Sequence, residues 1–422
     1  MIVANELIAA AASLVPLTQA VELNPRPERG ALSDDLEVSF VPMAAVGAAT
    51  GRMDPSTVRP FAEVKKGYTV FRENDVLFAK ITPCMENGKM AVARGLRNRV
   101  GCGSTEFHVL RPRPGVDPRY VYHFVSSARF RAEAAHHMTG AVGQRRVPTA
   151  FLEQCEIPLP NLEEQCRIVA EIDKQFSRLD EAVANLKRVK VNIKRYKAAV
   201  LKAAVEGLLL PADAKLALGH SGPAWRTASI GDVAQVISGL TKNPKRQAYP
   251  RKMPYLRVAN VYANELRLSE IEYIGVADGE VEKLLLREGD LLVVEGNGSP
   301  DQIGRVALWD ESIADCVHQN HLIKVRFGLE VVPEWALYWL LSPGGRGAIE
   351  RASSSTSGLH TLSTGKVSRL PLPLPPLAEQ ERIVSEVQRR LSLLAATEAS
   401  VQTELLRAAR LREGILCDVF HA

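Results

Sequence analysis

The chain has 422 residues, of which 46% are hydrophobic and 24% charged, and it carries a formal net charge of +5 with a pI near 8.8. Because a single hydrophobic core usually stops growing near ~250–300 residues, this length predicts at least two domains. The composition excludes a disordered chain, and no stretch approaches the ~18 apolar residues of a membrane span.

The N-terminal apolar stretch, Leu7–Leu17, has the length of a signal-peptide core, but Glu6 precedes it and no Lys or Arg does. We therefore expect a short amphipathic helix there. The six cysteines form no Cys-x-x-Cys pair. This spacing argues against a structural zinc site and favours a reduced, cytoplasmic protein.

One segment is spelled twice along the chain. Residues 158–172 read PLPNLEEQCRIVAEI and residues 373–387 read PLPPLAEQERIVSEV, with ten of fifteen positions identical at an offset of 215. The same offset places the strand-like stretch 39–47 on 254–262, and Gly143 on Gly358. Residues 1–207 and 216–422 are therefore two copies of one unit.

Each copy predicts a globular part with mixed strand and helix patterns, followed by a long helix. We place the first globular domain at 1–157 and its helix at 158–210, and the second domain at 211–372 with its helix at 373–422. The predicted fold class is α+β, with two mixed α/β domains separated by two long helices. The duplication predicts approximate twofold symmetry.

The helical segments carry a 3.5-residue apolar repeat. In the first helix the repeat comprises Val169, Ile172, Phe176, Leu179, Val183 and Leu186, and in the second Val384, Val387, Leu391, Leu394, Val401, Leu405 and Ala408. Such a seam is typical of a coiled coil. The connectivity then requires an antiparallel pair, and a helix of ~45 residues spans about 67 Å. The alternative is two unrelated amphipathic helices that each pack on their own domain.

A search for catalytic patterns leaves one candidate. Asp54, Glu63 and Lys65 have the order of residues found in metal-dependent nucleases, in which carboxylates hold a divalent ion. Pro55 and Pro60 interrupt the strands that would carry these side chains, and the second copy does not repeat them. A chance match is the simpler interpretation.

Binding chemistry is better represented, because glycine-containing turns in both copies are rich in basic and amide side chains. Arginine and lysine contact guanine or phosphate, and asparagine and glutamine contact adenine. The candidate DNA-binding residues are Lys80, Asn87, Lys89, Arg94, Gln144, Arg145 and Arg146 in the first copy, and Asn297, Ser299, Gln302, Arg305, His360 and Lys366 in the second. Ordinary solvation remains the alternative for each of them.

The first helix also carries seven cations and no carboxylate between residues 182 and 202. A run of this kind is usually a solvated face. It would also attract DNA phosphates or an acidic partner surface.

The duplicated Pro-Leu-Pro, Glu-Gln and Arg-Ile-Val signature, with Gly143-Gln144 before its first copy, resembles the specificity subunits of type I restriction-modification systems. The resemblance covers essentially the whole chain. It implies two target-recognition domains that each bind half of a two-part DNA sequence, with the conserved helices as spacer, and no catalytic residues in this chain. Ser357-Gly358-Leu359-His360 lacks the glutamine that Gln144 supplies in the first copy.

The resemblance also implies the partners. Two modification subunits are expected to dock and to methylate adenine with S-adenosylmethionine, flipping the base out of the duplex. Restriction subunits are expected to add ATP-dependent cleavage with Mg²⁺, and no cofactor is expected on this chain. The matching signature positions make six residues candidates for the subunit interface: Gln165, Arg167, Glu171, Gln380, Arg382 and Glu386.

The leading hypothesis is thus a non-enzymatic DNA reader and scaffold in the cytoplasm. A metal-dependent nuclease and a scaffold that binds only proteins are the alternatives.

Overall fold

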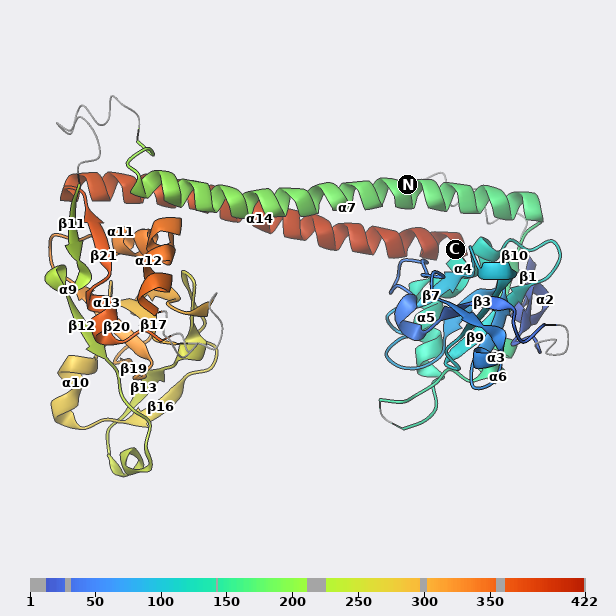
Figure 1. The fold of residues 1–422 in the computed structure, drawn as a ribbon, viewed down its shortest axis with the longest axis horizontal. Helices are drawn as coiled ribbons and strands as arrows, with labels where there is room; N and C mark the ends of the chain where they lie inside the picture. The colour runs from blue at the N-terminus through green and yellow to red at the C-terminus, as the bar shows by residue number, and fades with distance from the viewer. Residues whose placement is uncertain are drawn as a thin grey trace. The chain divides into compact units, whose positions relative to one another are not determined.

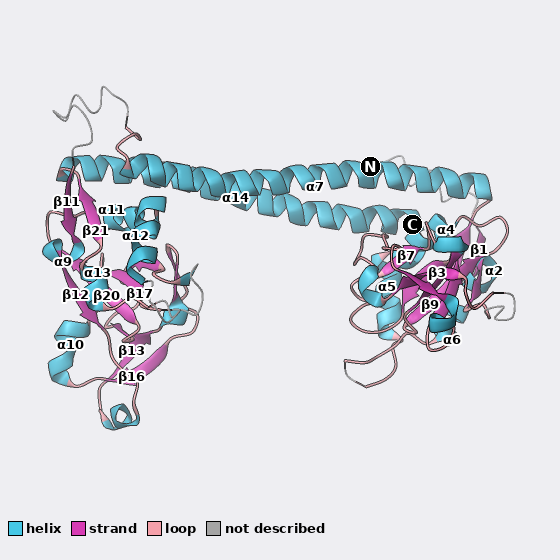
Figure 2. Cartoon of the chain, in the orientation of Figure 1, coloured by secondary structure: helices cyan, strands magenta, loops and turns pink. Residues whose placement is uncertain are grey.

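A computed structural model describes residues 13–26, 32–141, 143–210, 225–296, 302–353 and 361–420. The chain forms two compact units, Met1–Lys187 with Gln402–Ala422, and Arg188–Val401. Figure 1 follows the chain through both, and Figure 2 distinguishes helices from strands. Each unit contains one globular domain with a part of each long helix, so the two units are described separately below.

The described residues of the first unit form three sheets, with strand orders β4-β3-β8-β5, β2-β9-β6-β7 and β1-β10. Its elements are β1 Ser13–Pro16, α2 Leu17–Ala20, β2 Val21–Leu23, β3 Glu37–Val41, η1 Met43–Ala45, β4 Val58–Pro60, α3 Phe61–Val64, β5 Thr69–Arg72, β6 Val76–Ala79, β7 Met90–Val92, η2 Arg97–Arg99, β8 Val100–Gly103, β9 Phe107–Pro112, α4 Pro118–Ser126, α5 Ala128–His136, α6 Thr149–Gln154, β10 Glu156–Leu159 and the beginning of α7 Leu162–Val205.

Strand β6 shows why this domain folds in layers. All four of its residues are buried, which is typical of a strand covered on both faces. Val76 and Phe78 pack in a core with helices α4 and α5, whereas Leu77 and Ala79 pack in a second core against the other four-stranded sheet. Because neighbouring side chains of a strand point to opposite faces, one short apolar strand joins both cores.

The second unit has sheets of order β16-β13-β19, β12-β20-β17-β18, β11-β21 and β14-β15. Its elements are β11 Arg226–Ser229, α9 Ile230–Val233, β12 Ala234–Ser238, η3 Pro244–Ala248, β13 Lys252–Leu256, η4 Val258–Asn260, β14 Val261–Tyr262, β15 Glu265–Leu266, β16 Glu272–Gly275, α10 Asp278–Leu284, β17 Leu291–Val294, β18 Val306–Leu308, β19 Val317–His318, β20 Leu322–Phe327, α11 Pro333–Leu341, α12 Pro343–Ser353, α13 Thr364–Ser368, β21 Pro371–Leu374 and the beginning of α14 Leu377–Phe420.

The predicted duplication is confirmed at the level of single elements. The offset of 215 maps β3 onto β13, β6 onto β17, β9 onto β20, α4 onto α11, β10 onto β21 and α7 onto α14 with both ends in register. The predicted fold class, two mixed α/β domains with two long helices, is also confirmed. Both long helices have 44 residues, and none of the helices in the described ranges has the length and apolar character needed to cross a membrane.

The apolar seam predicted on the long helices is buried or half-buried at every position. In the first unit Asp180 of α7 accepts a hydrogen bond from Arg412 of α14 over 2.7 Å, and in the second Lys197 of α7 pairs with Glu398 of α14 over 2.6 Å. Within each unit an early part of one helix therefore packs with a late part of the other, as antiparallel helices require.

Helix α7 ends at the predicted glycine. Gly207 has a φ of +67°, a conformation that favours glycine because it has no Cβ. Leu208 N–H donates to Ala203 O over 2.8 Å and Gly207 N–H to Ala204 O over 3.2 Å. This is the Schellman pattern, which satisfies carbonyls left free at a helix end.

Two sequence-based expectations need correction. The predicted helix at Leu7–Leu17 lies mostly outside the described residues. Of its described part, Ser13–Pro16 is a strand paired with β10, and only Leu17 belongs to a helix, α2. The domain limits placed before residues 158 and 373 fall inside β10 and β21. The first two residues of each Pro-Leu-Pro segment are the end of a strand rather than part of a helix. Each of these strands pairs with only one neighbour, so proline's missing N–H is tolerated there.

Candidate nucleic-acid interface

Three loops of the first domain meet, and we call them the first loop cluster: residues 42–53, 80–89 and 143–147. Thr82 N–H donates to Arg145 O and Val147 N–H to Lys80 O, both over 2.9 Å, and Ala49 N–H donates to Gly88 O over 3.0 Å. These bonds bring together six of the residues predicted to bind DNA: Lys80, Asn87, Lys89, Gln144, Arg145 and Arg146.

The side chains of this cluster differ in their exposure to solvent. Asn87, Gln144 and Arg145 are exposed, whereas Lys80 and Lys89 are half-buried. Exposed basic and amide groups on adjoining loops are suited to phosphates and base edges. Their contact with DNA stays a prediction.

Arg146 is held by a carboxylate beside the cluster, that of Glu106, which precedes β9. Its Nε and Nη2 donate to Glu106 over 2.9 and 2.8 Å. The pKa of Glu106 is lowered, mainly by this bidentate hydrogen bond, and the pKa of Arg146 is raised by the same contact. The pair orients the guanidinium, because two parallel hydrogen bonds fix its plane.

Lys89 and Arg305 make equivalent hydrogen bonds to the backbone in the two copies. Lys89 Nζ donates to Met43 O in η1 over 3.0 Å, and Arg305 Nη2 donates to Val258 O in η4 over 3.3 Å. Met43 and Val258 are themselves separated by the offset of 215. Each cation therefore links a 3₁₀ turn to the start of a strand, since Lys89 immediately precedes β7 and Arg305 immediately precedes β18.

The prediction that Arg305 reads DNA is wrong for the structure as described. Its side chain is only 9% exposed, and its guanidinium stacks on Tyr262 with 4.8 Å between Cζ and the ring centroid. A buried guanidinium that packs on an aromatic ring and bonds a backbone carbonyl is a core element.

Arg94 lies outside the first loop cluster, and none of the backbone hydrogen bonds that join the three loops involves it. It is exposed, and its charge lies close enough to Asp173 on α7 to help lower the pKa of that carboxyl, after the larger effect of the hydrogen bond from His123.

The second domain has a matching set of loops, which we call the second loop cluster: residues 258–267, 295–296 with 302–305, and 361–366. Gly296 bridges Thr361, and Leu362 N–H donates to Glu295 O over 2.6 Å. Gln302 is exposed, and Lys366 is half-buried with Nζ donating to Thr361 O over 2.9 Å. The other predicted residues here, Asn297, Ser299 and His360, lie outside the described residues.

The signature glutamines are not at the surface, which corrects their prediction as interface residues. Gln165 is 1% exposed and Gln380 is 0% exposed. Gln380 Oε1 accepts from Val332 N–H over 2.9 Å, and its Nε2 donates to Glu330 O over 3.0 Å and to Pro375 O over 2.9 Å.

Gln165 makes the same three bonds 215 residues earlier in the chain, to Asp117 N–H, Gly115 O and Pro160 O. Each glutamine ties the start of a long helix to the loop that leads into α4 or α11. Glutamine suits this position because its amide both accepts and donates. The signature glutamine is therefore a structural link inside each domain.

The remaining predicted interface residues lie on the surface of the helix beginnings. Arg167 Nε donates to Glu164 over 2.8 Å, and Glu171 accepts from Lys174 over 3.1 Å. In the second copy Arg382 is exposed, and Glu386 accepts from Arg389 and Arg390. These two guanidinium groups lower the pKa of Glu386 to about 2.

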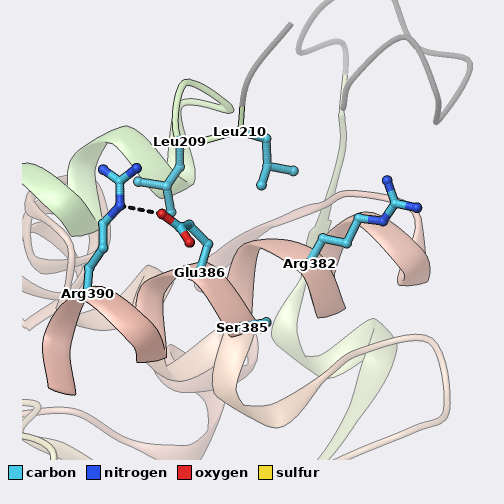
Figure 3. A pocket seen from close by; sticks show the side chains of 6 residues that line it. All are labelled: Leu209, Leu210, Arg382, Ser385, Glu386 and Arg390. Carbon is cyan, nitrogen blue, oxygen red and sulfur yellow. Dashed lines mark hydrogen bonds and ion pairs between the residues drawn. The ribbon is translucent and has the colours of Figure 1, made fainter. Parts of the chain in front are cut away.

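Figure 3 shows Arg382, Glu386 and Arg390 with Leu209 and Leu210 around an open pocket of about 370 Å³ in the second unit. Arg390 points toward Glu386, and Arg382 extends away from this pair. Surface arginines with apolar neighbours are common at protein interfaces. A role for Arg167, Glu171, Arg382 or Glu386 in subunit contacts stays a prediction.

The residues of the nuclease hypothesis have other partners. Lys65 Nζ pairs with Asp34 over 2.7 Å, and Asp54 accepts from Ser56 N–H over 3.0 Å. Glu63 lies on the single turn of α3 rather than on a strand. Among the described residues, no group of three or more His, Cys, Asp or Glu side chains is arranged to hold a metal ion.

The family model of the type I restriction modification DNA specificity domain matches residues 22–194 and 224–405, one match in each copy. The chain belongs to this family. Among curated DNA specificity proteins, it is 38% identical to the EcoAI specificity subunit of Escherichia coli over 39% of this chain and 28% of that protein. It is 28% identical to the StySPI specificity subunit of Salmonella potsdam over 74% of this chain and 66% of that protein.

Solved structures show the same fold. One comes from work on complex assembly and conformational transition of the type I R-M system, with a TM-score of 0.77 and 19% identity over 98% of both chains. Another is the HsdS subunit from Thermoanaerobacter tengcongensis, with a TM-score of 0.62 and 21% identity over 98% of both chains. The chain spans about a quarter of the first curated relatives and nearly the full length of these structural ones.

Three residues in or beside the two loop clusters are not among the residues predicted from the sequence: Glu106, Glu295 and His321. The internal repeat could have identified them, because Glu106 aligns with His321 at the offset of 215.

Proposed function

We propose that this chain is the specificity subunit of a type I restriction-modification system and binds a two-part double-stranded DNA sequence. Each globular domain recognises one half of that sequence. The observation that carries the proposal is the duplication within a DNA specificity family: two domains share one backbone framework but display different side chains on their loop clusters. A common scaffold with different reading loops suits two different half-sites.

The second part of the proposal is assembly. A duplicated chain presents two similar surfaces, so it can dock two copies of the same partner. We assign these partners as two modification subunits, joined by restriction subunits in the complete complex. The exposed helix beginnings around Arg167 and Arg382 are the proposed docking positions.

The third part concerns chemistry. We assign no catalytic step to this chain, and we place S-adenosylmethionine, ATP and Mg²⁺ on the partner subunits. The best nuclease candidates of the sequence, Asp54, Glu63 and Lys65, support this division because Lys65 and Asp54 are engaged in local structural contacts. The task of the chain is then to position a partner's active site over one sequence.

The proposal is tested by purifying the full chain with its modification subunits and supplying S-adenosylmethionine and a library of random DNA duplexes. Methylation is expected only on duplexes that contain both half-sequences at one fixed separation. DNA affinity should fall steeply between 50 and 200 mM salt, since phosphate contacts release counterions. Methylation that needs only one half-sequence, or that ignores sequence, would contradict the proposal.

A further inference from the structure

The two loop clusters share one backbone arrangement with opposite side-chain chemistry. In the first domain Lys80 follows β6, Glu106 precedes β9, and Arg146 lies on the adjoining loop. At the offset of 215 these positions are Glu295, His321 and Thr361. We call the two sets the first and the second triad.

The backbone contacts of the triads match one for one. Lys80 N–H donates to Glu106 O, and Glu295 N–H donates to His321 O, both over 2.9 Å. The bridge between Ile81 and Arg146 recurs between Gly296 and Thr361. Each triad thus sits on the same framework, so the side chains alone distinguish what it presents.

The first triad presents hydrogen-bond donors. Lys80 and Arg146 are cationic, and Arg146 is oriented by its two bonds to Glu106. The charge of Lys80 also contributes to the lowered pKa of Glu106, after the larger effect of Arg146. Both cations carry donors only and have no acceptor.

The second triad presents an acceptor instead. Glu295 replaces a lysine, and its Oε2 lies 2.7 Å from Nδ1 of His321. Thr361 replaces an arginine, so no guanidinium neutralises the carboxylate from this position. Glu295 is 30% exposed and His321 is 57% exposed. Because a carboxylate has about four lone-pair sites, one contact with histidine leaves it able to accept further hydrogen bonds.

Base edges in the major groove call for these opposite chemistries. Guanine offers two acceptors, O6 and N7, whereas cytosine N4 and adenine N6 are amino donors. Resting on the proposed function, we propose that the triads are specificity-determining: Lys80 donates to a guanine in one half-site, and Glu295 accepts from an amino group of cytosine or adenine in the other. The two domains therefore read bases of opposite hydrogen-bonding polarity at equivalent places.

The test maps base preference at every position of both half-sites, using the full chain with its modification subunits on a library of DNA duplexes. Glu295→Gln keeps the shape of the side chain but adds donors and removes the charge. We expect its discrimination to fall ~10-fold at one base position of one half-site, with the other half-site unchanged. Lys80→Met should relax one guanine position in the opposite half-site.

Glu282→Gln is the matched control, because Glu282 is an exposed glutamate on α10 of the same domain, outside the second loop cluster. It should leave every position unchanged. Tryptophan fluorescence checks folding, and the triple variant E295K/H321E/T361R, which transplants the first triad, should convert the affected position toward guanine.

The proposal is overturned if Glu295→Gln folds and changes no position, or weakens all positions equally. The amino base that the unaltered chain prefers at the affected position, cytosine or adenine, identifies which base Glu295 contacts. If the unaltered chain yields no two-part sequence at all, the proposed function fails, which is a different result from failure of the triads.

Discussion

The signature glutamines give the sharpest test of the fold. Gln380→Ala removes three hydrogen bonds of 2.9 to 3.0 Å that join the start of α14 to the loop before α11. At ~1 kcal/mol for each bond, the variant should lose about 3 kcal/mol of unfolding free energy in the second unit. With an m-value of roughly 2–3 kcal/mol/M, this loss lowers the urea midpoint by about 1 M or more.

The assay can report on one unit in the intact chain. All four tryptophans lie in the second copy, at positions 225, 309, 335 and 339, so their fluorescence follows the unfolding of the second unit. Gln380→Ala should shift this transition. Gln165→Ala, the equivalent change, should leave it in place but reduce the protection of α4 amides against hydrogen exchange.

Gln247→Ala is the control, because Gln247 is an exposed glutamine in the 3₁₀ turn η3 of the second unit, the unit that the tryptophans report. It should change stability by less than about 0.5 kcal/mol, as surface substitutions usually do. A Gln380→Ala variant whose unfolding free energy also changes by less than about 0.5 kcal/mol would refute the structural role of the signature glutamine.

Three further variants test other parts of the structure. Phe420→Ala should destabilise the first unit by about 3–4 kcal/mol, measured by hydrogen exchange in α4, because Phe420 is 5% exposed and its ring packs 5.7 Å from that of Phe124. Asp290→Ala should lower the unfolding free energy of the second unit by about 3 kcal/mol, measured by tryptophan fluorescence in urea, since it leaves Arg326 without its 2.6 Å partner. Glu63→Ala should leave DNA cleavage by the complete complex unchanged, and loss of cleavage would revive the nuclease hypothesis.

The large features of this chain could be predicted because they depend on periodicity. The duplication is visible as repeated letters, and the helix seam as a 3.5-residue spacing from Val169 to Leu186. The end of α7 could be predicted from Gly207, since a glycine after a long apolar repeat is a common helix stop. Each of these signals is local or repeats at a fixed interval.

The roles of single polar residues could not be predicted in the same way. Gln165 and Gln380 were placed at an interface because they belong to a signature, yet their partners are backbone groups up to 50 residues away. Arg305 was read as a surface cation because its neighbours are loop residues, but Tyr262 and Val258 O enclose it. Burial of a polar group depends on contacts distant in sequence, which composition and spacing do not encode.

The central claim is that this chain selects a two-part DNA sequence for methylation. The most direct measurement maps methylated adenines across the genome of the cell that carries the chain, with the gene intact and with it disrupted. The account predicts a two-part motif with a fixed gap that is methylated only when the gene is intact. A methylation pattern that is the same in both cells would contradict it.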